Sequence, residues 1–212
     1  MDDRAFIESH LAVRTSVLVP EISLYLATSL TPLWLATESF LHQHNMAPPY
    51  WAFAWPGSEA MACFIQANPT IVTGKRVLDF AAGCGLAGIA AAKAGAAYVE
   101  AAEIDKLAVA AIKLNASLNE VDIAVTLGDI IDQQGAWDVI LTGDVCYEQG
   151  MARRVMSWLK DQAKCSIVLM ADPGRRYRPK EPGAKKADYN VPTSLELEES
   201  ESRVVTIYEI FA

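Results

Sequence analysis

The chain has 212 residues, of which 52% are apolar and 21% charged, and its formal net charge is −8. This composition excludes a disordered chain and indicates a globular protein with a full core, with or without an appendage. The acidic balance argues against a nucleic-acid partner, because binding phosphates needs clustered Lys and Arg. It suits a basic partner, such as a lysine-bearing protein or a cationic cofactor, or simple solubility.

No apolar run reaches the roughly 18 to 20 residues that cross a bilayer, so we expect no membrane partner. The start, MDDRAFIESH, is neither a basic segment followed by an apolar one nor an Arg-rich transit peptide. We therefore expect a cytoplasmic protein, and we further expect a monomer. Neither the four cysteines nor the three histidines are spaced as metal ligands, so we expect no metal site.

Residues 1–47 are interpreted as an N-terminal helical extension, broken by Pro20 and Pro32, in front of a larger domain at 48–212. The extension could cap a cofactor or recognise a substrate, and the sequence leaves both roles open. The larger domain begins with an aromatic stretch bounded by prolines, PPYWAFAWPG. A helix is then expected from about Ser58, a candidate N-cap with acid in the first turn.

From residue 76 onward, short apolar strands alternate with helices. The expected strands are RVLDF at 76–80, AAYVEAAEI at 96–104, DIAVTL at 122–127, WDVILTG at 137–143 and CSIVLMAD at 165–172. The expected helices lie at 86–95, 106–119 and 151–160, and Leu107, Leu114 and Leu118 share one face of the second. Such near-continuous apolar strands are typical of a doubly wound α/β fold, which binds its ligand at the carboxyl ends of parallel strands.

Beyond residue 172 the pattern changes. Residues 173–192 are rich in Pro, Gly, Lys and Arg and are expected to form a loop. SLELE at 194–198 and RVVTIYEIF at 203–211 are expected to form an antiparallel hairpin at the sheet edge. The whole is a mostly parallel, seven-stranded Rossmann-like sheet, which is not the usual layout of a dinucleotide dehydrogenase. The loop is either solvated or touches an acidic patch of a protein substrate through its basic residues Arg175, Arg176, Arg178, Lys180, Lys185 and Lys186.

The stretch DFAAGCGLAG at 79–88 matches the G-x-G-x-x-G pattern, which is weak evidence by itself. In dinucleotide-binding folds such glycines seat a pyrophosphate at a helix N-terminus. Asp79 at the strand end would repel that anion and suits an ammonium or sulfonium group. Glu103 ends the next strand and can accept hydrogen bonds from ribose hydroxyls, which fits either NAD or S-adenosylmethionine.

Acids also follow the third and fourth strands. Asp129 and Ile130 follow the third, where the acid could meet an adenine edge and the isoleucine could pack on the ring. Asp144 and Tyr147 follow the fourth, and both can face the crevice if the chain turns there. Each acid alone could be an exposed residue or a helix cap, but four acids at strand ends together indicate one ligand crevice.

On these residues the sequence resembles the seven-β-strand class I methyltransferases that use S-adenosylmethionine. More closely, it resembles the electron transfer flavoprotein beta-subunit lysine methyltransferase family. The resemblance runs from about residue 19 to 172 and is weaker beyond. It is carried by VPEISLYLAT at 19–28, PYWAFAWPG at 49–57, VLDFAAGCG at 77–85, GDVCY at 143–147 and ADPGR at 171–175.

The resemblance implies a transferase that methylates lysines of the electron transfer flavoprotein beta subunit, with S-adenosylhomocysteine as product and no metal. It implies that Asp144 orients the lysine nitrogen or holds the cofactor's ammonium group, and that Tyr147 packs against the lysine stem. Cofactor contacts are expected from Trp55, Ser58, Asp79, Ala81, Gly83, Gly85, Glu103, Asp129, Ile130 and Asp144. Substrate contacts are expected from Trp51, Phe53, Tyr147 and Arg175, although the aromatic residues could instead belong to the core.

One residue departs from the class pattern acid-x-Gly-x-Gly-x-Gly. Ala81 stands at the first glycine position, and because Ala tolerates positive φ poorly, we expect ordinary backbone angles there. Within enzymes, the alternative function is methylation of another protein, such as a ribosomal protein, or of a small amine. Two further alternatives belong to other functional classes. Asp79 argues against a nucleotide-binding oxidoreductase, and Asp144 with Tyr147 argues against an inactive binding module.

Overall fold

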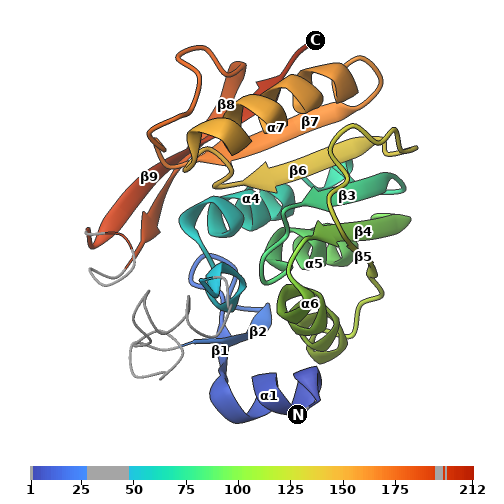
Figure 1. Cartoon of the computed structure of the whole chain (residues 1–212), viewed down its shortest axis with the longest axis vertical. Helices are drawn as coiled ribbons and strands as arrows, with labels where there is room; N and C mark the ends of the chain where they lie inside the picture. Colours follow the sequence, from blue (N-terminus) through green and yellow to red (C-terminus); the bar gives the residue numbers. More distant parts are fainter. Residues whose placement is uncertain (1, 28–47, 194–197, 199) are drawn as a thin grey trace.

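The computed structural model of the chain describes residues 2–27, 48–193, 198 and 200–212. Its centre is a seven-stranded sheet of order β5-β4-β3-β6-β7-β9-β8 (Figure 1). The strands are β3 (Arg76–Phe80), β4 (Tyr98–Glu103), β5 (Ala124–Leu127), β6 (Val139–Gly143), β7 (Ile167–Asp172), β8 (Ala184–Pro192) and β9 (Ser202–Ile210). Neighbours from β5 to β7 are parallel, whereas β9 is antiparallel to both β7 and β8. The mostly parallel seven-stranded sheet expected from the sequence is confirmed.

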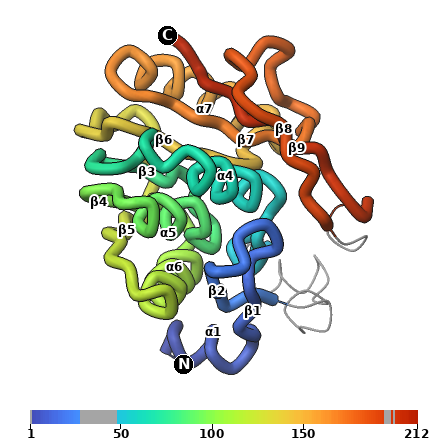
Figure 2. Tube along the Cα trace, turned by 180° about the vertical axis from the view of Figure 1, so that it is seen from behind, coloured from blue at the N-terminus to red at the C-terminus, as the bar shows by residue number. Residues whose placement is uncertain are grey.

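Helices cover both faces of the sheet because side chains on successive strand residues point to opposite faces. The helices α4 (Pro56–Ala67), α5 (Leu86–Lys93) and α6 (Lys106–Leu118) lie on one face, and α7 (Gln149–Gln162) lies on the other (Figures 1 and 2). On β3, Val77 packs with α4 and α5, whereas Leu78 packs with α7. The expected inward face of α6 holds for Leu114, but Leu118, its last residue, is 37% exposed. No described helix combines the length and apolar character that a bilayer crossing requires.

The helix α4 begins two residues before the expected start. Trp55 is its N-cap and Pro56 its first helical residue, a position where the missing N–H of proline removes no hydrogen bond. Ser58 therefore lies inside the first turn, and its hydroxyl donates to the carbonyl of Trp55 at 2.8 Å. This start brings the aromatic stretch before α4 to the carboxyl ends of β3 and β6.

The N-terminal segment differs from the expected helical extension. One helix, α1 (Asp3–His10), is followed by an antiparallel hairpin of β1 (Ala12–Thr15) and β2 (Ser23–Leu26). Two asparagines satisfy the free edge of β2: Oδ1 of Asn115 in α6 accepts from Tyr25 N at 2.7 Å, and Oδ1 of Asn119, the C-cap of α6, accepts from Ser23 N at 3.0 Å. The segment 28–47, with Pro32, lies outside the described residues.

The C-terminal hairpin has the expected antiparallel form, but its first strand was expected in the wrong place. Strand β8 occupies 184–192, within the stretch expected to be a loop, so Lys185 and Lys186 are strand residues. The reason is an alternation that the charged residues obscure: Ala187, Tyr189 and Val191 pack against the core. Most of the SLELE segment lies outside the described residues.

Candidate active site

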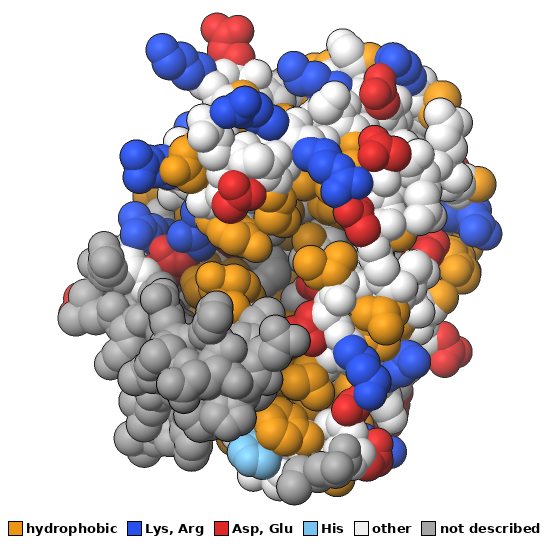
Figure 3. Space-filling model, in the orientation of Figure 1, with side chains coloured by type: hydrophobic (Ala, Val, Ile, Leu, Met, Phe, Trp, Pro, Cys, Tyr) orange, Lys and Arg blue, Asp and Glu red, His pale blue; other side chains and the backbone are white. Residues whose placement is uncertain are grey.

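The carboxyl ends of β3, β4 and β6 meet at a cavity of about 310 Å³. Figure 3 shows this face hollowed at its centre, with hydrophobic and acidic side chains around the hollow. A recess of about 40 Å³ adjoins the cavity under the turn after β3. The cavity is lined by Tyr50, Trp51, Trp55, Ala81, Gly83, Glu103, Gly143, Asp144, Val145, Tyr147, Met151 and Arg175.

The turn after β3 uses left-handed backbone angles at three positions. The φ angle is 54° at Ala81, 56° at Gly83 and 81° at Gly85. The expectation of ordinary angles at Ala81 is therefore wrong: the path of the turn from β3 into α5 sets its φ and overrides a steric cost of about 1–2 kcal/mol. Gly85 is the N-cap of α5 and lines neither the cavity nor the recess.

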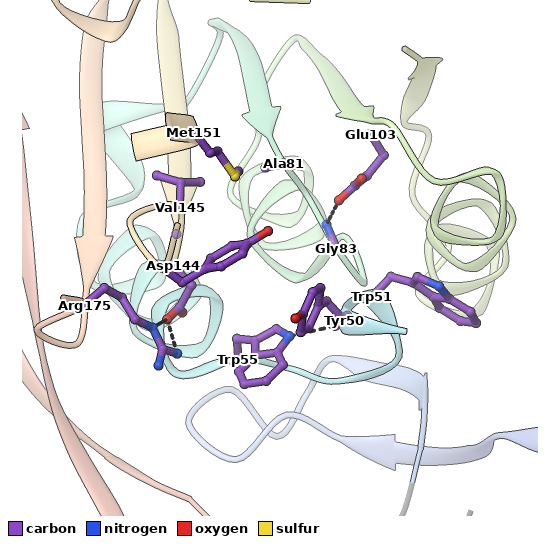
Figure 4. Close-up of a pocket in the computed structure, with 12 residues that line it drawn as sticks. Tyr50, Trp51, Trp55, Ala81, Gly83, Glu103, Asp144, Val145, Met151 and Arg175 are labelled. Carbon is purple, nitrogen blue, oxygen red and sulfur yellow. Dashed lines mark hydrogen bonds and ion pairs between the residues drawn. The ribbon is translucent and has the colours of Figure 1, made fainter. Parts of the chain in front are cut away.

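Glu103, the last residue of β4, extends toward this turn. Its Oε1 accepts a hydrogen bond from Gly83 N at 2.8 Å, as Figure 4 shows, and its Oε2 accepts one from Ile104 N at 2.9 Å. Burial raises the pKa of this carboxyl, and the two N–H donors oppose the rise. The carboxylate lines the cavity and keeps lone pairs that ribose hydroxyls can use.

Asp79 lines the recess below the turn. Its Oδ2 accepts a hydrogen bond from Gly88 N in the first turn of α5, at 2.8 Å. Burial raises the pKa of Asp79 to about 8; the Gly88 N–H opposes that rise and the negative charge of Glu103 adds to it. A cationic ligand beside this carboxyl would favour its ionised form.

Asp144 follows β6 directly and lies buried at the opposite side of the cavity from Glu103 (Figure 4). Its φ is 58°, a strained angle for a non-glycine residue, and the turn directs the carboxylate toward α4. Oδ2 accepts from Gly57 N at 2.5 Å, and Oδ1 accepts from Arg175 Nε at 2.7 Å. Burial raises the pKa of Asp144 to about 6, although the Arg175 guanidinium lowers it.

Three aromatic rings form the wall beside Asp144. Tyr50 lies 6.0 Å from Trp55 and 5.7 Å from Tyr147, measured between ring centroids. The Trp55 indole N–H donates to the Tyr50 carbonyl at 2.7 Å, which fixes the ring. Tyr147 is 49% exposed and lines the cavity with Asp144, so both residues face the crevice as expected.

Trp51 and Phe53, expected to contact substrate, are largely buried. Both pack in a cluster with Ile7 of α1 and with Leu114 of α6. Trp51 still lines part of the cavity, although Figure 4 shows its indole directed away from the centre. Phe53 lines the recess together with Ser58. Their main contacts are therefore with the core.

Asp129 and Ile130 do not join the other expected cofactor residues. Neither lines the cavity or the recess. Asp129 is exposed, forms an ion pair with Arg154 of α7, and accepts a hydrogen bond from Ile131 N at 2.9 Å. Ile130 is buried in the core on the α7 side of the sheet.

The structure also brings residues to the site that no sequence pattern singles out. Tyr50 stands in the aromatic stretch before α4, and its aromatic character is the signal that could have found it. Gly57 and Glu198 contact Asp144 and Arg175 from distant parts of the chain. Because these contacts are made between distant segments, no local pattern indicates them.

The arrangement fits a ligand that has a ribose and positive charge, as S-adenosylmethionine has. Glu103 stands where ribose hydroxyls could be accepted, and Asp79 and Asp144 are buried carboxyls beside the same cavity. Within the described ranges, no group of three His, Cys, Asp or Glu side chains is arranged to hold a metal ion.

Comparisons with known proteins agree with this geometry. A family model described as "Ribosomal protein L11 methyltransferase (PrmA)" matches residues 60–145. The fold is similar to the crystal structure of magnesium protoporphyrin IX methyltransferase from Synechocystis PCC 6803 with bound SAM, with a TM-score of 0.54, 17% identity, and coverage of 73% of this chain and 78% of that chain. That likeness concerns the fold alone.

Two curated relatives align over most of the chain. The electron transfer flavoprotein beta subunit lysine methyltransferase of Homo sapiens is 38% identical over 180 residues, which cover 81% of this chain and 66% of that protein. The homolog from Caenorhabditis elegans is 33% identical over 208 residues, which cover 85% of this chain and 84% of that protein. The chain belongs to the electron transfer flavoprotein beta subunit lysine methyltransferase family, and it has the class I methyltransferase fold.

Proposed function

We propose that this chain transfers the methyl group of S-adenosylmethionine to lysine side chains of the electron transfer flavoprotein beta subunit. One observation carries the proposal: Asp144 and Tyr147 line the same cavity as Gly83 and Glu103. Glu103, which suits a ribose, and Asp144, which suits an amine, thus face the same cavity. The substrate is named after the relatives, which cover most of the chain.

The side of the cavity near the turn after β3 would hold the cofactor. Glu103 would accept the ribose hydroxyls on the lone pairs that its bonds from Gly83 N and Ile104 N leave free. Asp79, in the recess under the same turn, would offset positive charge on the methionine part. When bound, S-adenosylmethionine supplies a methyl group on a sulfonium, a good leaving group for displacement by a neutral amine.

The opposite side would hold the lysine. Free lysine titrates near about 10.4, so the aromatic wall of Tyr50, Trp55 and Tyr147 must disfavour the ammonium form for an amine to react at neutral pH. Asp144 would orient the lysine nitrogen, and Tyr147 would pack along the aliphatic stem. The contribution of the protein is then alignment of two reactants and removal of water.

A second candidate substrate is a ribosomal protein, because the ribosomal protein L11 methyltransferase model matches residues 60–145. That match includes Gly83, Glu103 and Asp144 but ends before Tyr147 and Arg175. It therefore covers the cofactor side of the cavity and leaves out much of the side where the acceptor would bind. The match supports methyl transfer in general more than it supports this substrate.

The proposal is tested with S-adenosylmethionine that carries a deuterated methyl group. The chain is incubated separately with purified electron transfer flavoprotein beta subunit and with ribosomal protein L11, and the peptides are analysed by mass spectrometry. We expect label on lysines of the beta subunit. Label only on L11, or on neither protein while the cofactor binds, contradicts the substrate assignment.

Variants then test the two acceptor residues. Asp144→Asn and Tyr147→Phe are expected to reduce labelling at least about 10-fold, because orientation of the amine is lost. Asp161→Asn and Tyr98→Phe are matched controls, since Asp161 lies near the end of α7 and Tyr98 begins β4, away from the cavity. Undiminished turnover in the first pair would remove the roles assigned to those residues.

A further inference from the structure

The Asp144 carboxylate is held by a line of alternating charges that leads away from the cavity. Arg175 Nε donates to Asp144 Oδ1 at 2.7 Å. The same guanidinium donates to both oxygens of Glu198, from Nη1 at 3.1 Å and from Nη2 at 2.5 Å, and its Nη2 also lies 2.5 Å from Asp144 Oδ1. Arg203 completes the line by donating from Nε to Glu198 at 3.1 Å. The four charges balance, so the line is electrically neutral.

The backbone fixes where this arginine stands. Asp172, at the end of β7, accepts hydrogen bonds on Oδ1 from Gly174 N at 2.7 Å and from Arg175 N at 2.8 Å. These bonds fold the turn after β7 so that the Arg175 side chain lines the cavity. Its guanidinium also lies 5.8 Å from the centroid of the Trp55 ring. Arg175 is thereby held by a hydrogen bond from its backbone N–H, by its contact with the Trp55 ring and by two carboxylates.

Glu198 belongs to this line of charges but does not line the cavity itself. It is only 3% exposed and comes from the segment between β8 and β9, far along the chain from β6. Two guanidinium groups contact this buried carboxylate, and its two-point contact with Arg175 fixes the plane of that guanidinium. A lysine at position 175 could supply the charge but not this planar contact.

We propose that Arg175 and Glu198 are positioning residues: Glu198 holds Arg175, and Arg175 keeps the Asp144 carboxylate ionised and fixed at the acceptor end of the cavity. The consequence for methyl transfer rests on the function proposed above. The only other hydrogen bond described for the Asp144 carboxylate comes from Gly57 N, a neutral donor. Burial favours the protonated form of Asp144, and Arg175 is the cation that opposes it.

Other groups near Asp144 do not replace this cation. Cys146 and Tyr147 follow it in the same turn, and each is neutral until high pH because burial raises its pKa. Glu103 on β4 lines the same cavity, and the negative charge of Glu198 favours protonation of Asp144. Removal of Arg175 therefore takes away the cation that contacts this buried carboxyl, because Arg203 bonds to Glu198 and Arg178 pairs with Asp172.

The test follows Asp144 itself by carbon-13 NMR of aspartate-labelled full-length protein, with the resonance assigned by its loss in Asp144→Asn. The titration midpoint is expected near 6 in the parent chain and about 1 pH unit or more higher in Arg175→Gln. Glu198→Gln also removes a negative charge, which by itself lowers the midpoint, so a midpoint that stays at or above the parent value in this variant shows that Arg175 has lost its position. Arg175→Lys should give an intermediate midpoint, because it restores charge without the planar contact. Arg76→Gln is the matched control: Arg76 stacks on Tyr98 at the start of β3, at the other end of the strand from the cavity, and its loss should leave the midpoint unchanged.

Kinetics on the same variants separate the inference from the proposed function. The acid limb of kcat/KM for methyl transfer should move upward with the Asp144 midpoint, and much of the lost rate should return at pH 9. A midpoint that does not rise in Arg175→Gln, or that falls in Glu198→Gln, overturns the inference, whatever the activity. A midpoint that moves as expected supports it even if the parent chain methylates no lysine, a result that would contradict the proposed function instead.

Discussion

Gly57 and Asp144 are 87 positions apart in the sequence, and the backbone N–H of Gly57 donates to Asp144 Oδ2 at 2.5 Å. The approach is so close that a Cβ at position 57 would lie 2.9 Å from Asp144 N, and nearer still to the carboxylate. The glycine in Trp-Pro-Gly is thus explained by the acid after β6. Two segments that carry the family resemblance are joined through a single hydrogen bond.

Gly57→Ala is expected to reduce methyl transfer by about 100-fold or more, because the added methyl group must push the Asp144 carboxylate out of place. Binding of S-adenosylhomocysteine, measured by calorimetry, should fall much less, since Glu103 lies on the other side of the cavity. Gly150→Ala is the control, because its Cβ would meet only the flexible end of the Glu148 side chain. Equal activity of the two variants would contradict this account of Gly57.

Ala81→Gly is expected to stabilise the protein by about 1 kcal/mol, because glycine adopts the left-handed angle of 54° without steric cost. The free energy of unfolding from urea titration measures the effect. Ala82→Gly, at a buried position in the same turn without a positive φ, should destabilise instead. If both changes have the same sign, strain at Ala81 is not the cause.

Asp79→Asn is expected to change how stability depends on pH in the absence of ligand. Burial raises the pKa of Asp79 from 3.8 to about 8, so the folded state binds a proton that the unfolded state has released between these values. The free energy of unfolding of the parent chain should therefore fall as pH rises through this window, by up to about 1.4 kcal/mol per pH unit from this group.

The free energy of unfolding of the Asn variant lacks this dependence on pH. The difference in free energy of unfolding between the variant and the parent should therefore grow in favour of the variant from pH 5 to pH 8, while the affinity of the variant for S-adenosylmethionine drops. Urea titrations at several pH values give the difference between the two proteins. A constant difference across this range would mean that Asp79 is already ionised in the folded state without ligand.

Asn119→Ala is expected to lower the free energy of unfolding by about 1–3 kcal/mol. The change removes the side-chain partners of the half-buried backbone N–H and carbonyl of Ser23, so β2 loses one of its two asparagine attachments. Urea unfolding measures the loss, and Asn190→Ala on the exposed face of β8 should have little effect. An equally small effect at Asn119 would show that its bonds to Ser23 do not stabilise the hairpin.

The fold was largely predictable because its strands and helices have clear periods. The five parallel strands are apolar runs, and the helices between them are marked by their own apolar spacing. β8 was missed because Lys185 and Lys186 obscure the alternation of Ala187, Tyr189 and Val191. The β1–β2 hairpin was missed because side chains of α6, far along the chain, supply its hydrogen bonds.

The candidate site was predictable where a strand end places a residue. Asp79, Glu103 and Asp144 stand at the carboxyl ends of parallel strands, and topology alone brings them together. Asp129 also follows a strand end, but its exposed side chain pairs with Arg154 and does not line the cavity. The backbone angle of Ala81 was mispredicted because a local preference of about 1 kcal/mol is smaller than the constraint that the turn imposes.

The most direct test of the central claim is a crystal structure of the chain with S-adenosylhomocysteine. The account predicts that the ribose hydroxyls contact Glu103 and that the sulfur atom faces the space between Asp144 and Tyr147. It would be contradicted by a ligand bound elsewhere while this cavity stays empty at saturating concentration, or by a nicotinamide dinucleotide that fills the cavity in its place.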